Sequence, residues 1–252
     1  MASSVYRMYR SAIASASGVV GEALTRQLIL SPLCSEVRAL GAINRREFEG
    51  LSATKKIREL GPILDLPSQS PTTASDASEA GRLGSGDGGE GLSSVYAAFF
   101  VVGDGRWSTP ARLDEAKAFA ERCAEAKVPH VTLLSSLWSD GSLPVEGAKM
   151  HGEIAEAFKS MNQGRLSIFK PSLILPSGAA AAALADADFP EKSFNTILPI
   201  ARQFMPTTYR EVTLDDIVLA MRLNVELVAS QDPIEELTFA DMMAIIGKED
   251  TI

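Results

Sequence analysis

A glycine-containing turn, Ser15-Ala16-Ser17-Gly18-Val19-Val20-Gly21, follows the first apolar run of the chain and precedes a helical run. A pyrophosphate is bound by backbone N–H groups at a helix N-terminus, provided that no bulky side chain blocks its approach. Gly18 permits this approach, and Gly21 lets the helix pack closely on the strand. Ser15 replaces the usual first glycine, so a tight turn without a ligand is the alternative. The predicted dinucleotide site comprises Ser15, Ser17, Gly18, Val19, Val20 and Gly21.

Two arginines, Arg45 and Arg46, follow the second predicted strand at residues 37–40. NAD-preferring folds place an acidic residue after this strand, and residues 41–46 contain none. A guanidinium binds a 2′-phosphate bidentately, so the arginines favour NADP(H); two solvated arginines are the alternative. Asp65, at the end of a third predicted strand, is expected near the adenine, unless it is only a turn residue.

Short β-rich runs alternate with helical runs along the chain, which is typical of βαβ units. Such units form an α/β fold in which helices cover both faces of a parallel sheet. We expect strands over residues 6–14, 37–40, 62–66, 95–102, 130–135 and 166–173. We expect helices over residues 18–30, 109–126, 189–205, 213–228 and 238–246.

The 252 residues, 46% of them hydrophobic, suffice for one large core, so residues 1–252 are predicted to form a single domain. Residues 67–94 are rich in Ser, Gly and Thr, and we predict a disordered loop there. Residues 186–252 are predicted to be a helical C-terminal part of the same domain.

Charge and rare residue types exclude several classes of protein. The net charge of −8 lacks the basic excess on which nucleic-acid binding draws. Cys34 and Cys123 are isolated, and His130 and His151 are the only histidines, so we predict no metal site and no disulfide scaffold. The longest apolar run, residues 173–185, is too short to span a bilayer, so a soluble protein is expected.

The N-terminus carries two conflicting signals. Residues 1–21 contain Arg7, Arg10, several serines and no acidic residue, as mitochondrial transit peptides do. The same stretch supplies the only candidate for a strand before the glycine turn. We therefore predict a cytoplasmic protein, with a mitochondrial location as the alternative.

Several segments in the same order resemble the atypical short-chain dehydrogenases/reductases, most closely the Tat-interacting-protein-like oxidoreductases. The matching segments are residues 14–21, 44–46, 101–103, 133–136, 151–153, 167–172 and 212–217. The resemblance implies a Rossmann fold with NADP(H) along the C-terminal edge of the strands and a small C-terminal region on the substrate side. It also adds Val102, Gly103 and Pro171 to the cofactor site.

Reductases of this family use a Tyr-x-x-x-Lys pair on the helix after the fifth strand, together with a serine at the end of that strand. If Lys149 is the family lysine, Val145 stands at the tyrosine position; if His151 replaces the lysine, Gly147 does. Neither register keeps the phenol that exchanges the proton. The candidate catalytic residues implied by the resemblance are Ser135, Ser136, Lys149 and His151.

Together with the resemblance, the residues predict an NADP(H)-binding protein similar to the atypical short-chain class, and the missing tyrosine of that class implies weak oxidoreductase activity. The alternative is a non-catalytic Rossmann-fold subunit within a protein complex. The substrate cannot be inferred from these residues.

Overall fold

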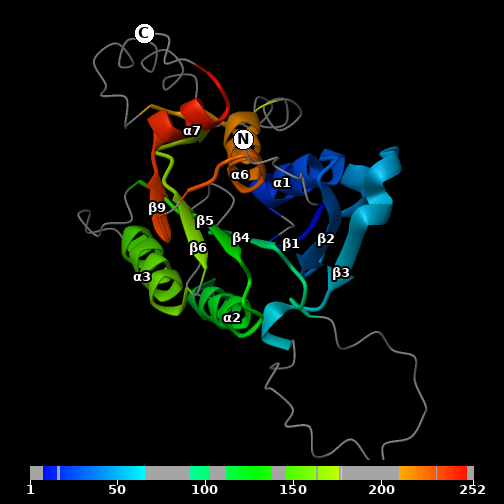
Figure 1. The fold of residues 1–252 in the computed structure, drawn as a ribbon, viewed down its shortest axis with the longest axis horizontal. Helices are drawn as coiled ribbons and strands as arrows, with labels where there is room; N and C mark the ends of the chain where they lie inside the picture. Colours follow the sequence, from blue (N-terminus) through cyan, green and yellow to red (C-terminus); the bar gives the residue numbers. More distant parts are fainter. Residues whose placement is uncertain are drawn as a thin grey trace, which may run out of the picture.

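The computed structural model describes residues 8–15, 18–65, 91–102, 112–137, 146–162, 164–175, 177, 210–230 and 232–248. Within these ranges, strands and helices alternate, and helices lie on both faces of one sheet (Figure 1). The candidate residues Ser17 and Gly103, the predicted loop residues 67–90 and the predicted helix over 189–205 lie outside the described residues.

In the described part of the chain, the central sheet has seven parallel strands in the order β3-β2-β1-β4-β5-β6-β9. From β1 the chain moves outward through β2 and β3, and then in the opposite direction through β4, β5 and β6. This is the doubly wound Rossmann-type arrangement, which confirms the predicted α/β fold. The strands are β1 (Tyr9–Ala14), β2 (Cys34–Leu40), β3 (Ile57–Leu60), β4 (Ala97–Val101), β5 (His130–Leu134), β6 (Arg165–Phe169) and β9 (Ile234–Leu237).

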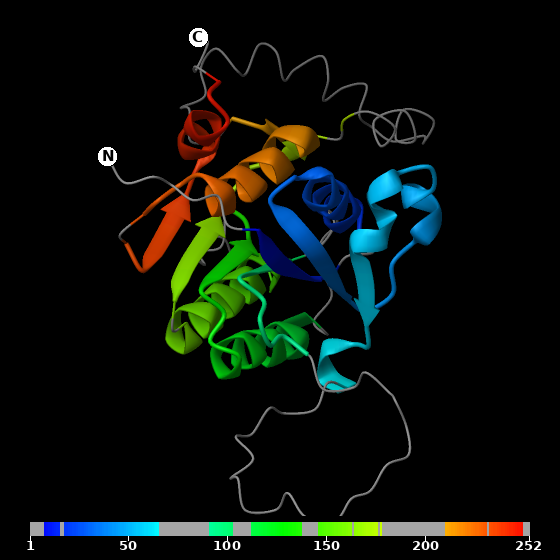
Figure 2. The ribbon, with the colours of Figure 1, turned by 45° about the vertical axis from the view of Figure 1, so that its right-hand side comes forward.

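Two pairs of helices cover the sheet: α1 packs beside α6 on one face, and α2 beside α3 on the other (Figure 2). One hydrophobic cluster includes Leu24 of α1 and Ile217 of α6, and a second includes Phe119 of α2 and Phe158 of α3. Phe100 on β4 lies 5.5 Å from each of the last two rings, measured between centroids. The helices are α1 (Val19–Leu30), α2 (Arg112–Glu125), α3 (Glu146–Met161), α6 (Leu214–Glu226) and α7 (Phe239–Ile245).

Capping residues fix where the C-terminal helices begin. At α6, the Thr213 side chain accepts a hydrogen bond of 3.2 Å from the backbone N–H of Asp216. At α7, Thr238 and Asp241 form a reciprocal capping box. The helices predicted over 18–30, 109–126, 213–228 and 238–246 are confirmed, within the described residues, as α1, α2, α6 and α7.

The third strand lies earlier than the sequence predicts. The predicted strand over 62–66 is wrong, because Ile63–Asp65 form a short 3-10 turn, η3, beyond the end of β3. β3 is an edge strand that pairs only with β2, so it tolerates Arg58 and Glu59 and shows a weak hydrophobic pattern.

The C-terminal part supplies strands as well as helices. Residues 186–252 were predicted to be helical, yet β9 pairs with β6 and extends the sheet. Its Glu235 and Glu236 accept hydrogen bonds from Arg165 and Lys170, which accommodates an acidic segment at the sheet edge. A separate two-stranded sheet consists of β7 (Ile174–Leu175) and β8 (Val212–Thr213).

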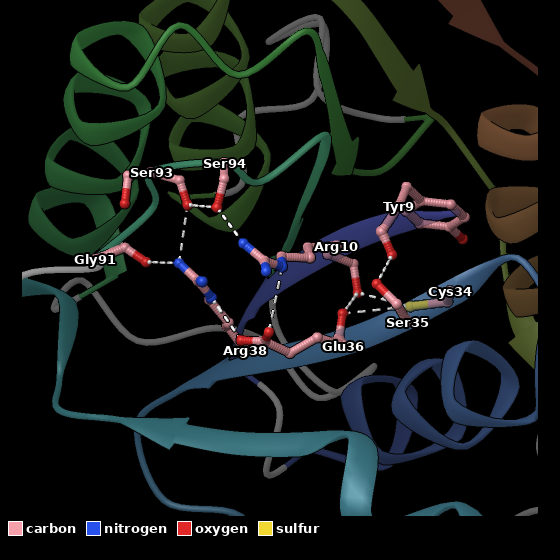
Figure 3. A network of polar contacts seen from close by, with 10 residues as sticks. Tyr9, Arg10, Cys34, Ser35, Glu36, Arg38, Gly91, Ser93 and Ser94 are labelled. Carbon is pink, nitrogen blue, oxygen red and sulfur yellow. Dashed lines mark hydrogen bonds and ion pairs between the residues drawn. The ribbon is translucent and has the colours of Figure 1, made fainter. Parts of the chain in front are cut away.

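A buried arginine connects β2 to the turn before β4. The fully buried side chain of Arg38 donates a hydrogen bond of 2.8 Å to the Glu36 carboxylate (Figure 3). It also donates to the backbone carbonyl oxygens of Gly91 and Ser93, at 2.7 and 3.0 Å. The predicted disordered run over 67–94 therefore extends too far at its C-terminal end, where the chain forms an anchored turn.

Candidate functional site

The carboxyl ends of β1 and β4 lie side by side, where the chain reverses its direction along the sheet. In open α/β sheets, ligands bind in the crevice outside this switch point. Ser15 directly follows β1, Val102 directly follows β4, and α1 begins after Gly18. The structure thus places Ser15, Gly18 and Val102 at the edge of the sheet where open α/β folds bind their ligands.

Two described residues of the glycine turn, Ser15 and Gly18, have backbone features that suit an anion site. Ser15 has a φ of +63°, in the left-handed region where glycine is favoured. Gly18 is the N-cap of α1 and has no side chain to bind the N–H groups of the first turn, unlike Thr213 at α6. These N–H groups can therefore bind an anion. Val20 and Gly21 are buried, so they shape the turn through their packing.

The two predicted phosphate-binding arginines differ in their surroundings. Both lie in η1 (Arg45–Phe48), a 3-10 turn four residues beyond β2. The exposed side chain of Arg45 forms an ion pair with Glu59 of β3. Arg46 is exposed and forms no ion pair with the described residues. Among the described residues, Arg45 therefore has an ionic partner and Arg46 has none.

Two carboxylates that were not predicted for the site are Glu22, in the first turn of α1, and Glu47, in η1. Burial, and then the nearby charge of Glu47, raise the pKa of Glu22 in the first turn of α1. Arg26 donates to the backbone carbonyl of Glu47 and lies over the ring of Phe48, 5.9 Å from its centroid. The position of Glu22, four residues after Gly18, was the available sequence signal. The first turn of α1 and η1 together therefore carry both acidic and basic side chains.

Asp65 does not occupy the position that the sequence predicts for it. It was expected to end the third strand, but it lies in η3, which packs against α2. The end of β3 is Leu60, followed by Gly61. The cause is the misplaced strand, since the buried Ile63 belongs to the cluster under α2 and not to the sheet.

The structure brings Ser135 and His151 together. Ser135 is the first residue after β5, and its backbone N–H donates to the Phe169 carbonyl oxygen at 2.9 Å. Its Oγ lies 3.4 Å from Nδ1 of His151 on α3. Burial lowers the pKa of the half-buried His151. The pair joins a hydroxyl and an imidazole at the same edge as the glycine turn, two strands away.

The remaining candidate residues take different positions. Residues two apart on a helix point in nearly opposite directions. His151 therefore faces Ser135, whereas Lys149 points away from it and is exposed. Ser136 is partly buried beside Ser135. β6 ends at Phe169 rather than at the predicted residue 173, so Pro171 lies beyond the strand, and its carbonyl oxygen accepts a bond from Leu137.

The described parts of the chain lack the features of two other kinds of site. No group of three or more His, Cys, Asp or Glu side chains is arranged there to hold a metal ion. No described helix is both long and apolar enough to cross a membrane.

Comparison with known proteins identifies relatives by fold only. No protein-family model matches the sequence, and no curated protein matches it. Many solved structures do match in fold, at identities of 10–14% among the most similar.

Three of these structures represent the group. UDP-N-acetylglucosamine 4-epimerase from Methanobrevibacter ruminantium M1, in complex with UDP-N-acetylmuramic acid, has a TM-score of 0.58 and 11% identity over 92% of this chain and 77% of its own. Triphenylmethane reductase from Citrobacter sp., complexed with NADP(H), has a TM-score of 0.56 and 13% identity over 91% and 69%. MoeE5, with UDP-glucuronic acid and NAD, has a TM-score of 0.55 and 13% identity over 90% and 75%.

Proposed function

We propose that this chain binds NADP(H) at the switch point between β1 and β4 and is an oxidoreductase-like protein of the atypical short-chain dehydrogenase/reductase type. The observation that carries the proposal is the N-terminus of α1, where Gly18 supplies no capping side chain, in the same turn as Ser15 with its left-handed backbone. Solved structures with this fold hold NAD or NADP(H), which supports a dinucleotide as the ligand.

The residues at this edge fit such a cofactor. The first-turn N–H groups of α1 and the positive end of its dipole would hold the pyrophosphate. Gly18 leaves the approach free of a side chain, and Val102 lies at the adjacent strand end. A bound nicotinamide donates or accepts a hydride.

The choice of NADP(H) over NAD(H) rests on Arg46. A 2′-phosphate adds negative charge close to the end of β2, where η1 exposes this guanidinium. Arg45 would first have to leave Glu59, although an exposed ion pair of this kind is weak. Glu47, beside both arginines, opposes the phosphate and limits the preference.

Calorimetric titration with NADPH and NADH tests the proposal. One charge-assisted contact is worth about 1.5–3 kcal/mol, which corresponds to roughly ten- to a hundredfold in affinity. We expect Arg46→Gln to lose that much affinity for NADPH and little for NADH. Lys117→Gln removes the same charge from the exposed surface of α2 and should change neither affinity.

The outcomes of this titration separate the parts of the proposal. Equal affinity of the wild-type chain for both nucleotides would contradict the NADP(H) preference alone. Binding of neither nucleotide would reject the cofactor and favour a non-catalytic subunit.

Turnover should be slow in the direction of carbonyl reduction. No tyrosine occurs between residues 97 and 208, so helix α3 lacks the phenol that related reductases use. Acid–base assistance contributes typically 10²- to 10⁴-fold to a rate. An NADPH-consumption screen over aldehydes, ketones and quinones at neutral pH should therefore give rates near background.

A further inference from the structure

We infer that His151 accepts the proton from a substrate hydroxyl during oxidation by NADP⁺, and that Ser135 positions the imidazole. The inference rests on the proposed function, because it requires NADP⁺ as the oxidant. It adds the direction of the favoured reaction and the atom that receives the proton.

The geometry supplies an imidazole where the phenol is missing. α3 carries His151 to Ser135 at the carboxyl end of β5, with 3.4 Å between Nδ1 and Oγ. The second ring nitrogen, Nε2, forms no hydrogen bond with the described residues. His151 is partly exposed, as the approach of a substrate oxygen to this nitrogen requires. Catalytic hydrogen bonds are often this long before a ligand binds.

The inferred role requires the tautomer of His151 that carries its proton on Nδ1. When Nδ1–H donates to Ser135 Oγ, Nε2 keeps its lone pair and can accept a proton. The substrate C–H then leaves as a hydride with its two electrons to the nicotinamide, while the hydroxyl proton passes to Nε2. The products are the carbonyl compound, NADPH and a proton that His151 returns to solvent.

His151 remains a base at neutral pH. Within the described parts of the chain, burial is the only cause that lowers its pKa, and no charged side chain on α2, α3, β5 or β6 contributes to the shift. Lys149 and Glu153, which flank it on α3, are exposed, and Lys170 beyond β6 is paired with Glu236. The neutral imidazole favours alcohol oxidation, whereas carbonyl reduction requires the scarce imidazolium.

A nucleophilic role for Ser135 fits the geometry less well. Acyl transfer needs backbone N–H groups that bind the developing oxyanion. The N–H groups of Ser135 and Leu137 already donate to the carbonyl oxygens of Phe169 and Pro171, both at 2.9 Å. These two N–H groups, which lie close to the Ser135 hydroxyl in sequence, are therefore not free to bind an oxyanion.

Alcohol oxidation by NADP⁺ tests the inference over a panel of primary and secondary alcohols. We expect turnover that rises with pH up to the pKa of His151, below 6.5, and then stays constant. His151→Ala should lower kcat by 10²- to 10⁴-fold, abolish this pH dependence and leave the NADP⁺ affinity unchanged. Imidazole added to the buffer should restore part of its rate. Glu153→Gln, an exposed change on the same helix, should behave as the wild type.

Two further measurements separate positioning from catalysis. Ser135→Ala should lower kcat more than it changes KM, and Ser135→Thr should recover the rate. Diethyl pyrocarbonate should modify His151 and leave the buried His130 intact, and bound NADP⁺ should slow the modification.

The possible failures are distinguishable. Unchanged turnover in His151→Ala overturns the inference, as does a wild-type chain that binds NADP⁺ but oxidises no alcohol on the panel; both leave cofactor binding intact. Absence of NADP⁺ binding by calorimetry rejects the proposed function itself.

Discussion

His130 Nε2 lies 2.7 Å from Ser167 Oγ, within the sheet and at the amino end of β5. Ser167 donates its only proton to Glu235 at 2.5 Å and accepts a bond from Asn224 at 2.9 Å. Burial raises the pKa of Glu235, but hydrogen bonds from Ser167, Asn224 and then Arg165 outweigh it, so its pKa lies below its ordinary value. Glu235 is therefore ionised, and His130 must donate from Nε2.

This relationship predicts the protonation state of His130. Burial, and then the charge of Arg165, lower its pKa to about 3. We expect a neutral Nε2–H tautomer throughout pH 4.5–8, observed in ¹⁵N-detected NMR spectra that contain only two histidines. A protonated ring at pH 5 would contradict this assignment, and His151→Gln identifies which resonance belongs to His130.

The same shift has a consequence for stability. Between about pH 6.5 and 3, the unfolded state binds a proton at His130 that the folded state does not. The free energy of unfolding should therefore fall as the pH decreases through this window, by at most about 1.4 kcal/mol per pH unit. His151, whose pKa is also lowered, adds a change of the same sign. Urea denaturation of His151→Gln removes the contribution of His151. His130→Asn in that background should reduce the slope further, and this difference measures the part due to His130, because Glu22, Glu235 and Glu236 titrate in both variants.

Arg38 and Arg10 share the partner Glu36 but differ in burial. The Arg38 side chain is 0% exposed and that of Arg10 is 44% exposed. We expect Arg38→Met to lower the free energy of unfolding by about 3 kcal/mol, because it leaves a carboxylate and two carbonyl oxygens without this donor. The control Arg10→Met should cost about 1 kcal/mol or less. Equal losses in urea denaturation would show that burial of Arg38 is unimportant.

Gly164 lies against the backbone before β5. A Cβ at this position would stand 2.5 Å from the carbonyl oxygen of Pro129, which also accepts a hydrogen bond from the N–H of Arg165. Gly164→Ala should therefore strain the pairing of β5 with β6 and cost about 1–3 kcal/mol. Gly61→Ala is the matched control, since its Cβ would meet nothing within 4 Å. Thermal unfolding of both variants measures the difference, and a stable Gly164→Ala would refute the close contact.

The buried strands and amphipathic helices could be predicted from the sequence because their patterns follow from burial. β4 and β5 are buried along their whole length. β4 is therefore a continuous apolar run, and β5 is apolar except at His130 and Thr132. The two edge strands could not be predicted. β3 contains Arg58 and Glu59, and β9 contains Glu235 and Glu236, since a strand with one neighbour can expose charge or pair it locally.

The candidate site was predictable in part for the same reason. The glycine turn occurs where a strand passes into a helix, which local sequence reveals. The choice between Lys149 and His151 required the rotation of α3 relative to β5, which depends on packing across the whole sheet. Asp65 was misassigned because it depended on the position of an edge strand.

Ser15→Gly tests the turn itself. At a φ of +63° the serine occupies a region that costs L-residues roughly 1–2 kcal/mol. Glycine avoids this cost but loses more backbone entropy on folding, so only part of the energy is recovered. We expect the free energy of unfolding to rise by about 0.5–1 kcal/mol in urea denaturation. Gly41→Ala, at a φ of +96° with open space around its Cβ, should lower it through conformation alone.

The same variant measures whether the serine limits nucleotide binding. If the Ser15 side chain crowds the pyrophosphate, its removal should raise the affinity for NADPH and NADH equally, because both share that group. Arg46→Gln should act on NADPH alone, so the two changes should be additive in the double variant. An affinity that stays constant while stability rises would mean that the serine strains the turn without obstructing the ligand.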